Sequence, residues 1–281
     1  MTEYYFELAG LQVVLRTQEP ILVADRLRPF LRKKKETPHC TIQVQEGILP
    51  PASRNVIWNG HNGYDRREEG LYLYHCQRQG EAPFAATCFR QKNAVDILVA
   101  PGYMDHFAGT SGVFNRLGLE TWLLEQNCLL LHGAVINYNG VGILFSGPSG
   151  VGKSTQAALW EEHRSARIIN GDRAILKQTE EGYTAYGSPY AGSSGIYRNE
   201  SVPLTAVVVL EQAKENSLRK LTAKEALLRL YPEVSCLQFD KRSVEKTTDL
   251  LLAMLDRVPV FLLQCVRSES AVLCLEKGLG L

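Results

Sequence analysis

Residues 147–154 match the spacing G-x-x-x-x-G-K-[ST] at each of its fixed positions. The apolar run before them, 141–146, predicts a buried strand, and residues 154–160 after them predict a helix. In this setting glycines let backbone N–H groups turn toward phosphate oxygens, and the helix N-terminus adds partial positive charge. The pattern therefore predicts a nucleotide phosphate site formed by Gly147, Pro148, Ser149, Gly150, Val151, Gly152, Lys153, Ser154 and Thr155.

Two side chains of this stretch have expected roles of their own. Lys153 would neutralise the β- and γ-phosphates, and Ser154 would offer its hydroxyl to Mg²⁺. Transfer of a phosphate also needs a carboxylate to hold the metal or to take the acceptor's proton. Asp172 is the best candidate, because it follows an apolar strand that comes after the helix. We therefore predict Ser154 and Asp172 as metal ligands.

Composition limits the class of protein. Of 281 residues, 45% are hydrophobic and 22% charged, which is typical of a globular chain, and the formal net charge of +1 favours neither nucleic acid nor membrane as partner. The basic run 32–35 lies among polar residues and is expected to be a solvated loop. The sequence contains no run of eighteen apolar residues, so no membrane span is predicted, and its first residues do not resemble a signal peptide. The seven scattered cysteines suggest free thiols in a reducing compartment, so we expect a cytoplasmic enzyme.

Two domains are expected. Residues 1–105 read as short strands separated by turns, and they carry no recognisable chemistry. Residues 106–281 begin with an amphipathic helix over 111–126 and continue as alternating strands and helices. Within them, Asn139-Gly140 predicts a tight antiparallel hairpin that leads into the 141–146 strand.

Further candidates lie near Asp172. Arg173 and Arg198 could spread the negative charge of a transferring phosphate, and each could equally be an ordinary surface arginine. His132 ends an apolar run, where it could be a hydrogen-bonded core residue or a catalytic one. Residues 187–199 are rich in glycine and serine, which predicts a mobile surface loop that is either a lid or a plain connection.

These residues resemble the carboxy-terminal catalytic domain of HPr kinase/phosphorylase, a bacterial serine kinase whose core is similar to that of phosphoenolpyruvate carboxykinase. The shared pattern is a histidine, a strand, a short turn, a second strand, the phosphate loop and a later acidic segment, here His132, 134–138, Asn139-Gly140, 141–146, 147–154 and 170–173. The chain also resembles a group of HPr-kinase-related proteins found beside peptide-maturation genes. In that group a divergent amino-terminal part precedes the kinase-like core. Where the kinase has two adjacent acids, this chain has Gly171-Asp172.

The resemblance implies an α/β fold, with a mixed-sheet P-loop kinase core over 106–281 preceded by a smaller β-rich domain over 1–105. It also implies a role for His132 near the base and the phosphate, and a possible homo-oligomer. With the pattern it predicts an ATP- and Mg²⁺-dependent phosphotransferase acting on a serine or other hydroxyl of a protein or peptide, with Asp172, His132, Lys153 and Arg198 as catalytic residues. Residues 1–105 would then dock the acceptor or serve as structural cover.

Two alternatives remain open. The missing second acid favours an ATP-binding regulatory or scaffold module that transfers no phosphate. A reaction on a small molecule, of carboxykinase type, is less favoured because no arginine cluster marks a carboxylate site. The sequence does not identify the acceptor.

Overall fold

The computed structural model describes residues 1–34 and 37–281, which form two compact units. Unit 1 comprises Met1–Gln126 and Leu237–Lys241, and unit 2 comprises Asn127–Cys236 and Arg242–Leu281. The basic run 32–35, expected to be a solvated loop, falls partly on Lys35, which lies outside the described residues.

The boundary predicted at residue 105 is wrong, because residues 106–126 belong to unit 1. They include the helices α1 (Thr110–Arg116) and α2 (Leu119–Glu125). The ring of Phe114 packs edge-on against Phe6 at 5.4 Å, and the guanidinium of Arg116 lies 5.2 Å from the ring of Phe84. An amphipathic pattern shows that a helix buries one face, but not which sheet it is buried against.

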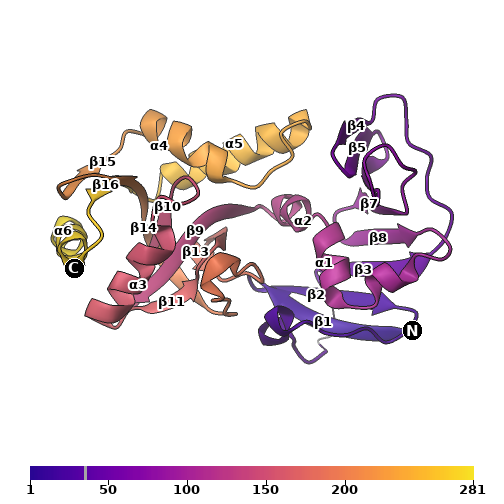
Figure 1. The fold of residues 1–281 in the computed structure, drawn as a ribbon, viewed down its shortest axis with the longest axis horizontal. Helices are drawn as coiled ribbons and strands as arrows, with labels where there is room; N and C mark the ends of the chain where they lie inside the picture. Colours follow the sequence, from indigo (N-terminus) through magenta and orange to yellow (C-terminus); the bar gives the residue numbers. More distant parts are fainter. Residues whose placement is uncertain (35–36) are drawn as a thin grey trace. The chain divides into compact units, whose positions relative to one another are not determined.

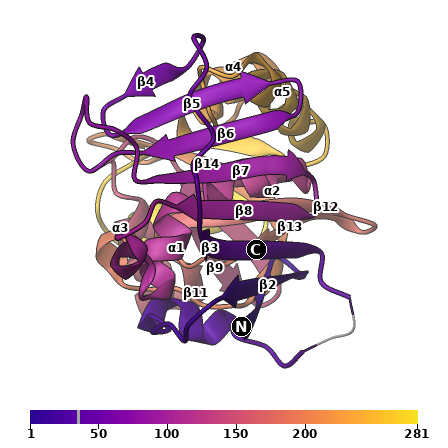
Figure 2. The ribbon, with the colours of Figure 1, turned by 90° about the vertical axis from the view of Figure 1, so that its right-hand side faces the viewer.

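Unit 1 is built on one mixed sheet of eight strands. The order across it is β1-β2-β3-β8-β7-β6-β5-β4, and Figure 2 shows β4 to β3 stacked in this order. Strand β3 is parallel to β2 and β8, whereas the other neighbours are antiparallel. The strands are β1 (Thr2–Leu8), β2 (Leu11–Thr17), β3 (Cys40–Glu46), β4 (Ile57–Asn59), β5 (Asn62–Arg67), β6 (Gly70–His75), β7 (Ala85–Gln91) and β8 (Ala94–Val99), with short 3₁₀ helices at η1 (Asp25–Phe30) and η2 (Met104–Phe107).

The single helix expected over 111–126 is instead two short helices. They are separated at Gly118, which has a left-handed φ of +66°. This left-handed φ favours glycine, and a Cβ here would also lie 2.5 Å from Leu73 Cδ1, so the tip of that leucine would have to move. The apolar periodicity on either side continues in phase, which is why the sequence suggested one helix.

Unit 2 contains a second mixed sheet, in the order β10-β9-β12-β13-β14-β16-β15, with β11 beside β9 and a further pairing between β10 and β14 (Figure 1). The strands are β9 (Cys128–Tyr138), β10 (Val141–Ser146), β11 (Arg167–Asn170), β12 (Arg173–Thr179), β13 (Gly182–Tyr186), β14 (Ser201–Gln212), β15 (Ser217–Lys220) and β16 (Val260–Cys265). The helices are α3 (Lys153–Arg164), α4 (Ala223–Leu230), α5 (Lys241–Leu255) and α6 (Glu269–Leu279), with 3₁₀ turns η3 (Gly192–Ser194) and η4 (Tyr231–Glu233).

The hairpin predicted at Asn139-Gly140 is confirmed. Strands β9 and β10 pair antiparallel from Tyr138 opposite Val141 to Gly133 opposite Ser146. Both turn residues have positive φ, +50° at Asn139 and +88° at Gly140, as a two-residue turn between twisted strands requires. The strand expected over 134–138 is the second half of a longer strand, β9 (Cys128–Tyr138).

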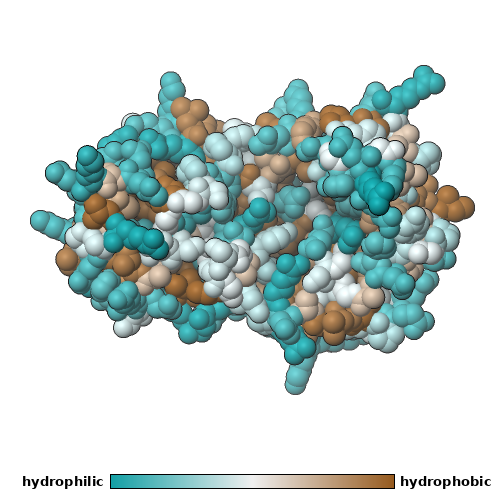
Figure 3. All heavy atoms as spheres, in the orientation of Figure 1, coloured by the Kyte–Doolittle hydropathy of each residue, from teal (hydrophilic) through white to brown (hydrophobic). Residues whose placement is uncertain are grey.

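One face of this sheet is covered by α3 and α6, while α4 and α5 lie on the other side (Figure 1). Ala157 and Trp160 of α3, together with Val272 and Leu275 of α6, are buried against β-strand side chains such as Phe145. On the face of the molecule shown in Figure 3, hydrophobic residues occur as separate patches between hydrophilic ones. Within the described residues, no helix is both long and apolar enough to cross a membrane.

Candidate functional site

Strand β9 brings two distant chain segments to one point. The end of β10 lies beside it, with Ser146 opposite Gly133, and the start of β12 lies on its other side, with Arg173 opposite His132. The backbone N–H of Gly133 donates to the carbonyl of Asp172 at 2.8 Å. A Cβ at Gly133 would lie 2.7 Å from the Phe145 carbonyl oxygen, so this close approach requires glycine. The loop after β10 and the Asp172 segment therefore flank His132.

The loop between β10 and α3 has the conformation that its glycines permit. We call residues 147–152 the glycine loop. Gly147, Gly150 and Gly152 have φ of +136°, +80° and +116°, and no atom lies within 4 Å of a Cβ built on either of the last two. These two glycines are thus required by the backbone conformation and not by packing. The predicted strand–loop–helix arrangement is present.

Lys153 begins α3 and closes the loop. Its ammonium donates to the carbonyl oxygens of Gly147 at 2.7 Å and Pro148 at 3.0 Å, and the residue is only 7% exposed. An ammonium has three N–H groups, so two bonds leave capacity for one phosphate oxygen. Burial lowers the pKa of Lys153, and the negative charges of Glu233 and Asp172 partly oppose this.

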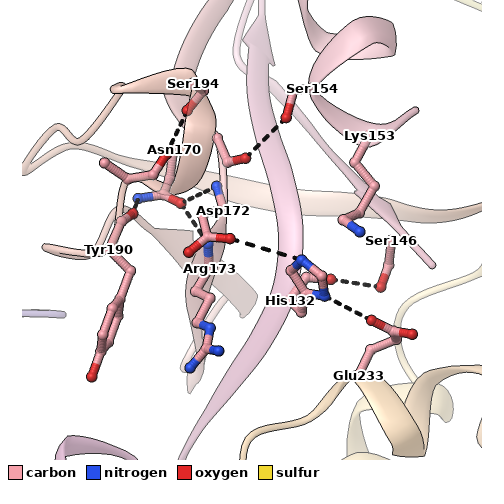
Figure 4. Close-up of polar contacts among 12 residues, drawn as sticks. His132, Ser146, Lys153, Ser154, Asn170, Asp172, Arg173, Tyr190, Ser194 and Glu233 are labelled. Carbon is pink, nitrogen blue, oxygen red and sulfur yellow. Dashed lines mark hydrogen bonds and ion pairs between the residues drawn. The ribbon is translucent and has the colours of Figure 1, made fainter. Parts of the chain in front are cut away.

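His132 lies between two carboxylates, as Figure 4 shows. Its Nδ1 is 2.9 Å from Glu233 Oε2, and its Nε2 is 3.8 Å from Asp172 Oδ1. The Glu233 side chain is 11% exposed, whereas those of His132 and Asp172 are 28% and 26% exposed. The glutamate thus holds the ring from the buried side, and Asp172 meets it at the more open side.

Sequence reasoning missed Glu233. The residue ends η4, and the chain there pairs with β9: Val234 forms a bridge with Leu131, and Ser235 N donates to Leu130 O at 2.8 Å. This pairing places Glu233 beside His132 although 101 positions separate them. A glutamate near the end of a helix has no local signal that would mark it.

Asn170 fixes the turn that carries Asp172. Its side chain is fully buried, and its Oδ1 accepts hydrogen bonds from the backbone N–H groups of Asp172 and Arg173 at 2.9 and 2.8 Å. Its Nδ2 donates to the carbonyls of Ser188 and Tyr190. The amide therefore ties the Asp172 turn to the 187–199 segment.

The expectation of a mobile surface loop over 187–199 needs correction. Besides the bonds from Asn170, the hydroxyl of Ser188 donates to Arg173 O at 2.6 Å, and Gly171 N donates to Ile196 O. Residues 187–189 are buried, and the exposed residues of this segment are Gly192, Ser193 and Gly195. Small residues suit this segment because it packs closely against the Asp172 turn.

Packing at this turn also bears on the absent second acid. A Cβ at Gly171 would lie 2.0 Å from Ser194 Oγ and 2.6 Å from Ser194 Cβ. Opposite it, a Cβ at Gly192 would lie 2.9 Å from the Asp172 carboxylate. The space where a side chain at position 171 would begin is thus filled by Ser194.

The two arginines lie elsewhere. Arg198 was expected to be catalytic, but its Nε donates to Ile168 O at 2.9 Å. Arg198 is also not among the residues that line the cavity at Asp172. The Arg173 guanidinium lies 5.2 Å from the Tyr190 ring and, in Figure 4, points away from His132.

A cavity of about 380 Å³ joins these groups. It is lined by the glycine loop, the start of α3, and His132, Gly171, Asp172 and Ser193. Ser154 Oγ lies within it and donates to Gly171 O at 3.3 Å, so a hydroxyl and a carboxylate from Asp172 face one space. Mg²⁺ prefers such oxygen ligands and is usually held by one or two of them together with phosphate oxygens. The residues fit that ion.

No disulfide joins any of the seven cysteines within the described residues. Four of them, Cys40, Cys76, Cys88 and Cys128, are buried, and the other three are partly exposed.

Comparison with known proteins gives two partial likenesses. Over 59 residues the chain is 39% identical to the HPr kinase/phosphorylase of Brevibacillus brevis. That stretch covers 21% of this chain and 19% of the relative, so the chain spans about a fifth of the relative's length. The solved structure of the Hpr(Ser) kinase/phosphatase from Coxiella burnetii aligns over 53% of this chain and 95% of that one, at 12% identity and a TM-score of 0.32.

A longer match assigns the family. The sequence profile of the SynChlorMet cassette protein ScmC matches residues 120–269, which are 150 of the 281 residues. The glycine loop, His132, Asp172 and Glu233 all lie inside it. The similarity to HPr kinase/phosphorylase is confirmed only as a partial one, and the chain belongs to the ScmC family of SynChlorMet cassette proteins.

Proposed function

We propose that unit 2 is an ATP-dependent phosphotransferase that moves the γ-phosphoryl group to a serine or other hydroxyl of a protein or peptide. The observation that carries this proposal is the convergence of Lys153, Asp172 and His132 on one cavity beside the glycine loop. The partial similarity to HPr kinase/phosphorylase supports the choice of a hydroxyl acceptor.

Binding would use the backbone first. The N–H groups of the glycine loop and of the start of α3 would donate hydrogen bonds to the phosphate oxygens, and the helix N-terminus adds partial positive charge. Lys153 would donate its remaining N–H to a β- or γ-phosphate oxygen. Ser154 and Asp172 would hold Mg²⁺, which when bound neutralises charge on the phosphate oxygens.

In the transfer step the acceptor oxygen forms a bond to the γ-phosphorus while the bond from that phosphorus to the β–γ bridging oxygen breaks. The acceptor's proton passes to the Asp172 carboxylate, and ADP leaves. His132, held through Nδ1 by Glu233, presents Nε2 to Asp172 and can share that proton. Arg198 has no part in this proposal, because it contacts the backbone of β11.

Transfer of label from γ-labelled ATP to serine-containing peptides tests the proposal. We expect wild type to label a peptide and Asp172→Asn to lose that labelling while still binding Mg-ATP. Asp256→Asn, at an exposed carboxylate outside the cavity, is the control and should behave as wild type. Labelling that persists in Asp172→Asn would exclude this role for Asp172. Tight ATP binding without any ADP formation would favour the regulatory module instead.

Unit 1 would dock the acceptor in this scheme. A cytoplasmic location, expected from the scattered cysteines, and self-association, implied by the family resemblance, belong to the same proposal.

A further inference from the structure

A second cavity, of about 440 Å³, lies on the glycine loop. It shares Gly150, Gly152 and Thr155 with the cavity at Asp172, so the loop borders both. Its remaining lining adds Val151 of the loop, Gln156 of α3 and residues at the ends of β14 and β16, and it contains neither His132 nor Asp172. It is thus a separate hollow beside the candidate phosphate site, with a different chemical character.

Topology places this cavity where a ligand of an α/β sheet is expected. Strands β10, β14 and β16 are parallel, and their carboxyl ends lie at Ser146, Gln212 and Cys265. Gln212, Cys265 and the residues that follow them line the cavity. In open α/β sheets, ligands bind outside the carboxyl ends of such strands.

An unsatisfied polar atom points to the ligand's chemistry. Gln156, in the first turns of α3, lines the cavity and is only 3% exposed. Its Nε2 donates to Cys265 Sγ at 3.3 Å, but its Oε1 is buried and accepts no hydrogen bond within the described part of the chain. A buried acceptor without a partner is costly, so such an atom suggests a donor supplied from outside.

We propose that this second cavity binds the nucleoside part of the nucleotide, with its phosphates on the glycine loop and its γ-phosphate toward Asp172. This inference rests on the proposed function, because it needs a nucleoside triphosphate as ligand. With the γ-phosphate toward Asp172 and the other phosphates along the glycine loop, the nucleoside would lie beyond the loop, where this cavity adjoins it.

The lining suits a base and a ribose. Gln156 Oε1 accepts an N–H of the base or an O–H of the ribose. Val266 and Cys265 provide an apolar wall, and Arg267 is exposed at the cavity, where its planar guanidinium can stack on an aromatic ring. The side chain of Gln212 bridges to the carbonyls of Gly150 and Val151 at 3.4 Å, which ties this wall to the loop.

Comparing Mg-ATP with magnesium tripolyphosphate isolates the contribution of the nucleoside. We expect wild type to bind Mg-ATP at least about tenfold more tightly, since one hydrogen bond and buried ring area each contribute on the order of a factor of ten. Ala213→Trp, which fills the cavity, should abolish that difference and leave tripolyphosphate affinity within about twofold. Ala223→Trp, at another cavity of unit 2, is the matched control and should keep the wild-type difference.

The outcomes separate the two proposals. If wild type binds neither ligand, the proposed function fails. If both ligands bind equally, or if Ala213→Trp keeps the full preference for ATP, the nucleoside assignment fails and the phosphate site stands.

A second measurement covers the case in which the tryptophan variant does not fold. Alkylation of Cys265 in wild type, read by peptide mass spectrometry, should slow several-fold with Mg-ATP but not with tripolyphosphate. Cys236, which lies outside this cavity, serves as the internal control. In addition, Gln156→Met removes the acceptor at similar size and should weaken ATP, but not tripolyphosphate, by about fivefold. Unprotected Cys265 would overturn the assignment.

Discussion

Glu233 holds His132 through a 2.9 Å contact to Nδ1, and this fixes which ring nitrogen faces Asp172. We therefore predict that Glu233→Gln, which keeps an oxygen acceptor but removes the charge, slows phosphate transfer less than Glu233→Ala. Loss of a hydrogen bond to a charged group corresponds to roughly ten- to a hundredfold in rate for the alanine variant. Single-turnover rates measure this. Equal rates in all three proteins would show that Glu233 only fills space.

The packing at Gly171 leads to a second prediction. Because a Cβ there would lie 2.0 Å from Ser194 Oγ, Gly171→Asp alone should destabilise unit 2 by about 1–3 kcal/mol without raising the transfer rate. Adding Ser194→Gly removes both close contacts and should recover most of that stability. Urea unfolding and transfer rates of the single and double variants test this. A fully stable single variant would contradict the account.

Lys153 should make the proposed ATP binding sensitive to alkaline pH. Burial lowers its pKa below the ordinary 10.5, so just below pH 10.5 the free protein has partly lost this proton. Bound phosphate favours the charged form, and binding in that window should therefore take up protons and weaken as pH rises. Calorimetry in two buffers of different ionisation enthalpy measures the uptake. Lys153→Arg stays charged and should show none; uptake that persists in it would assign the effect to another group.

The β9–β10 hairpin leads into the glycine loop, and its turn has two residues with positive φ, a conformation that favours glycine and asparagine. Gly140 has φ of +88° with no atom within 4 Å of a built Cβ, so Gly140→Ala meets a backbone cost and no clash. We expect a loss of about 1–2 kcal/mol in the unfolding free energy of unit 2. Glu181→Ala, at an exposed turn of the same unit, is the control and should change it by less than about 0.5 kcal/mol. Equal effects of the two would contradict this.

Elements defined by local chemistry were predictable. The strand–loop–helix around Lys153 and the Asn139-Gly140 hairpin follow from residues close together in sequence. Features set by tertiary contact were not. No pattern near Glu233 or Ser194 indicates that pairing with β9 or packing on Gly171 brings them to the site.

The domain boundary was also missed because tertiary contacts, and not local sequence, determine it. The chain passes from unit 1 to unit 2 after Gln126, and the segment Leu237–Lys241 returns to unit 1. There Arg66 forms a two-bond pair with Asp240 at 3.1 and 2.6 Å, and the Tyr64 ring lies 5.3 Å from that of Phe239. A five-residue return has too little sequence to be recognised, although it completes the packing of unit 1.

Because the chain divides into two compact units, we expect them to unfold separately, and acid should affect unit 1 through His75. This residue is buried between Asn62 and Thr87 in unit 1. Burial, with a smaller effect of Arg116, lowers the pKa of His75 from 6.5 to about 4. Between these values the unfolded chain binds a proton that the folded unit does not, so stability falls as pH decreases, by about 3 kcal/mol in total.

Two single-tryptophan variants can report the unfolding of each unit. One keeps Trp122 in unit 1 and the other keeps Trp160 in unit 2, and both of these side chains are fully buried. The urea midpoint reported by Trp122 should decrease as the pH is lowered from 6.5 to about 4. His75→Gln, which has no titrating ring, should remove most of this dependence of the midpoint on pH. The slope reported by Trp160 should be the same with and without His75→Gln. If the substitution changes both reporters equally, the two units unfold as one cooperative body, and the division at Gln126 describes packing without describing stability.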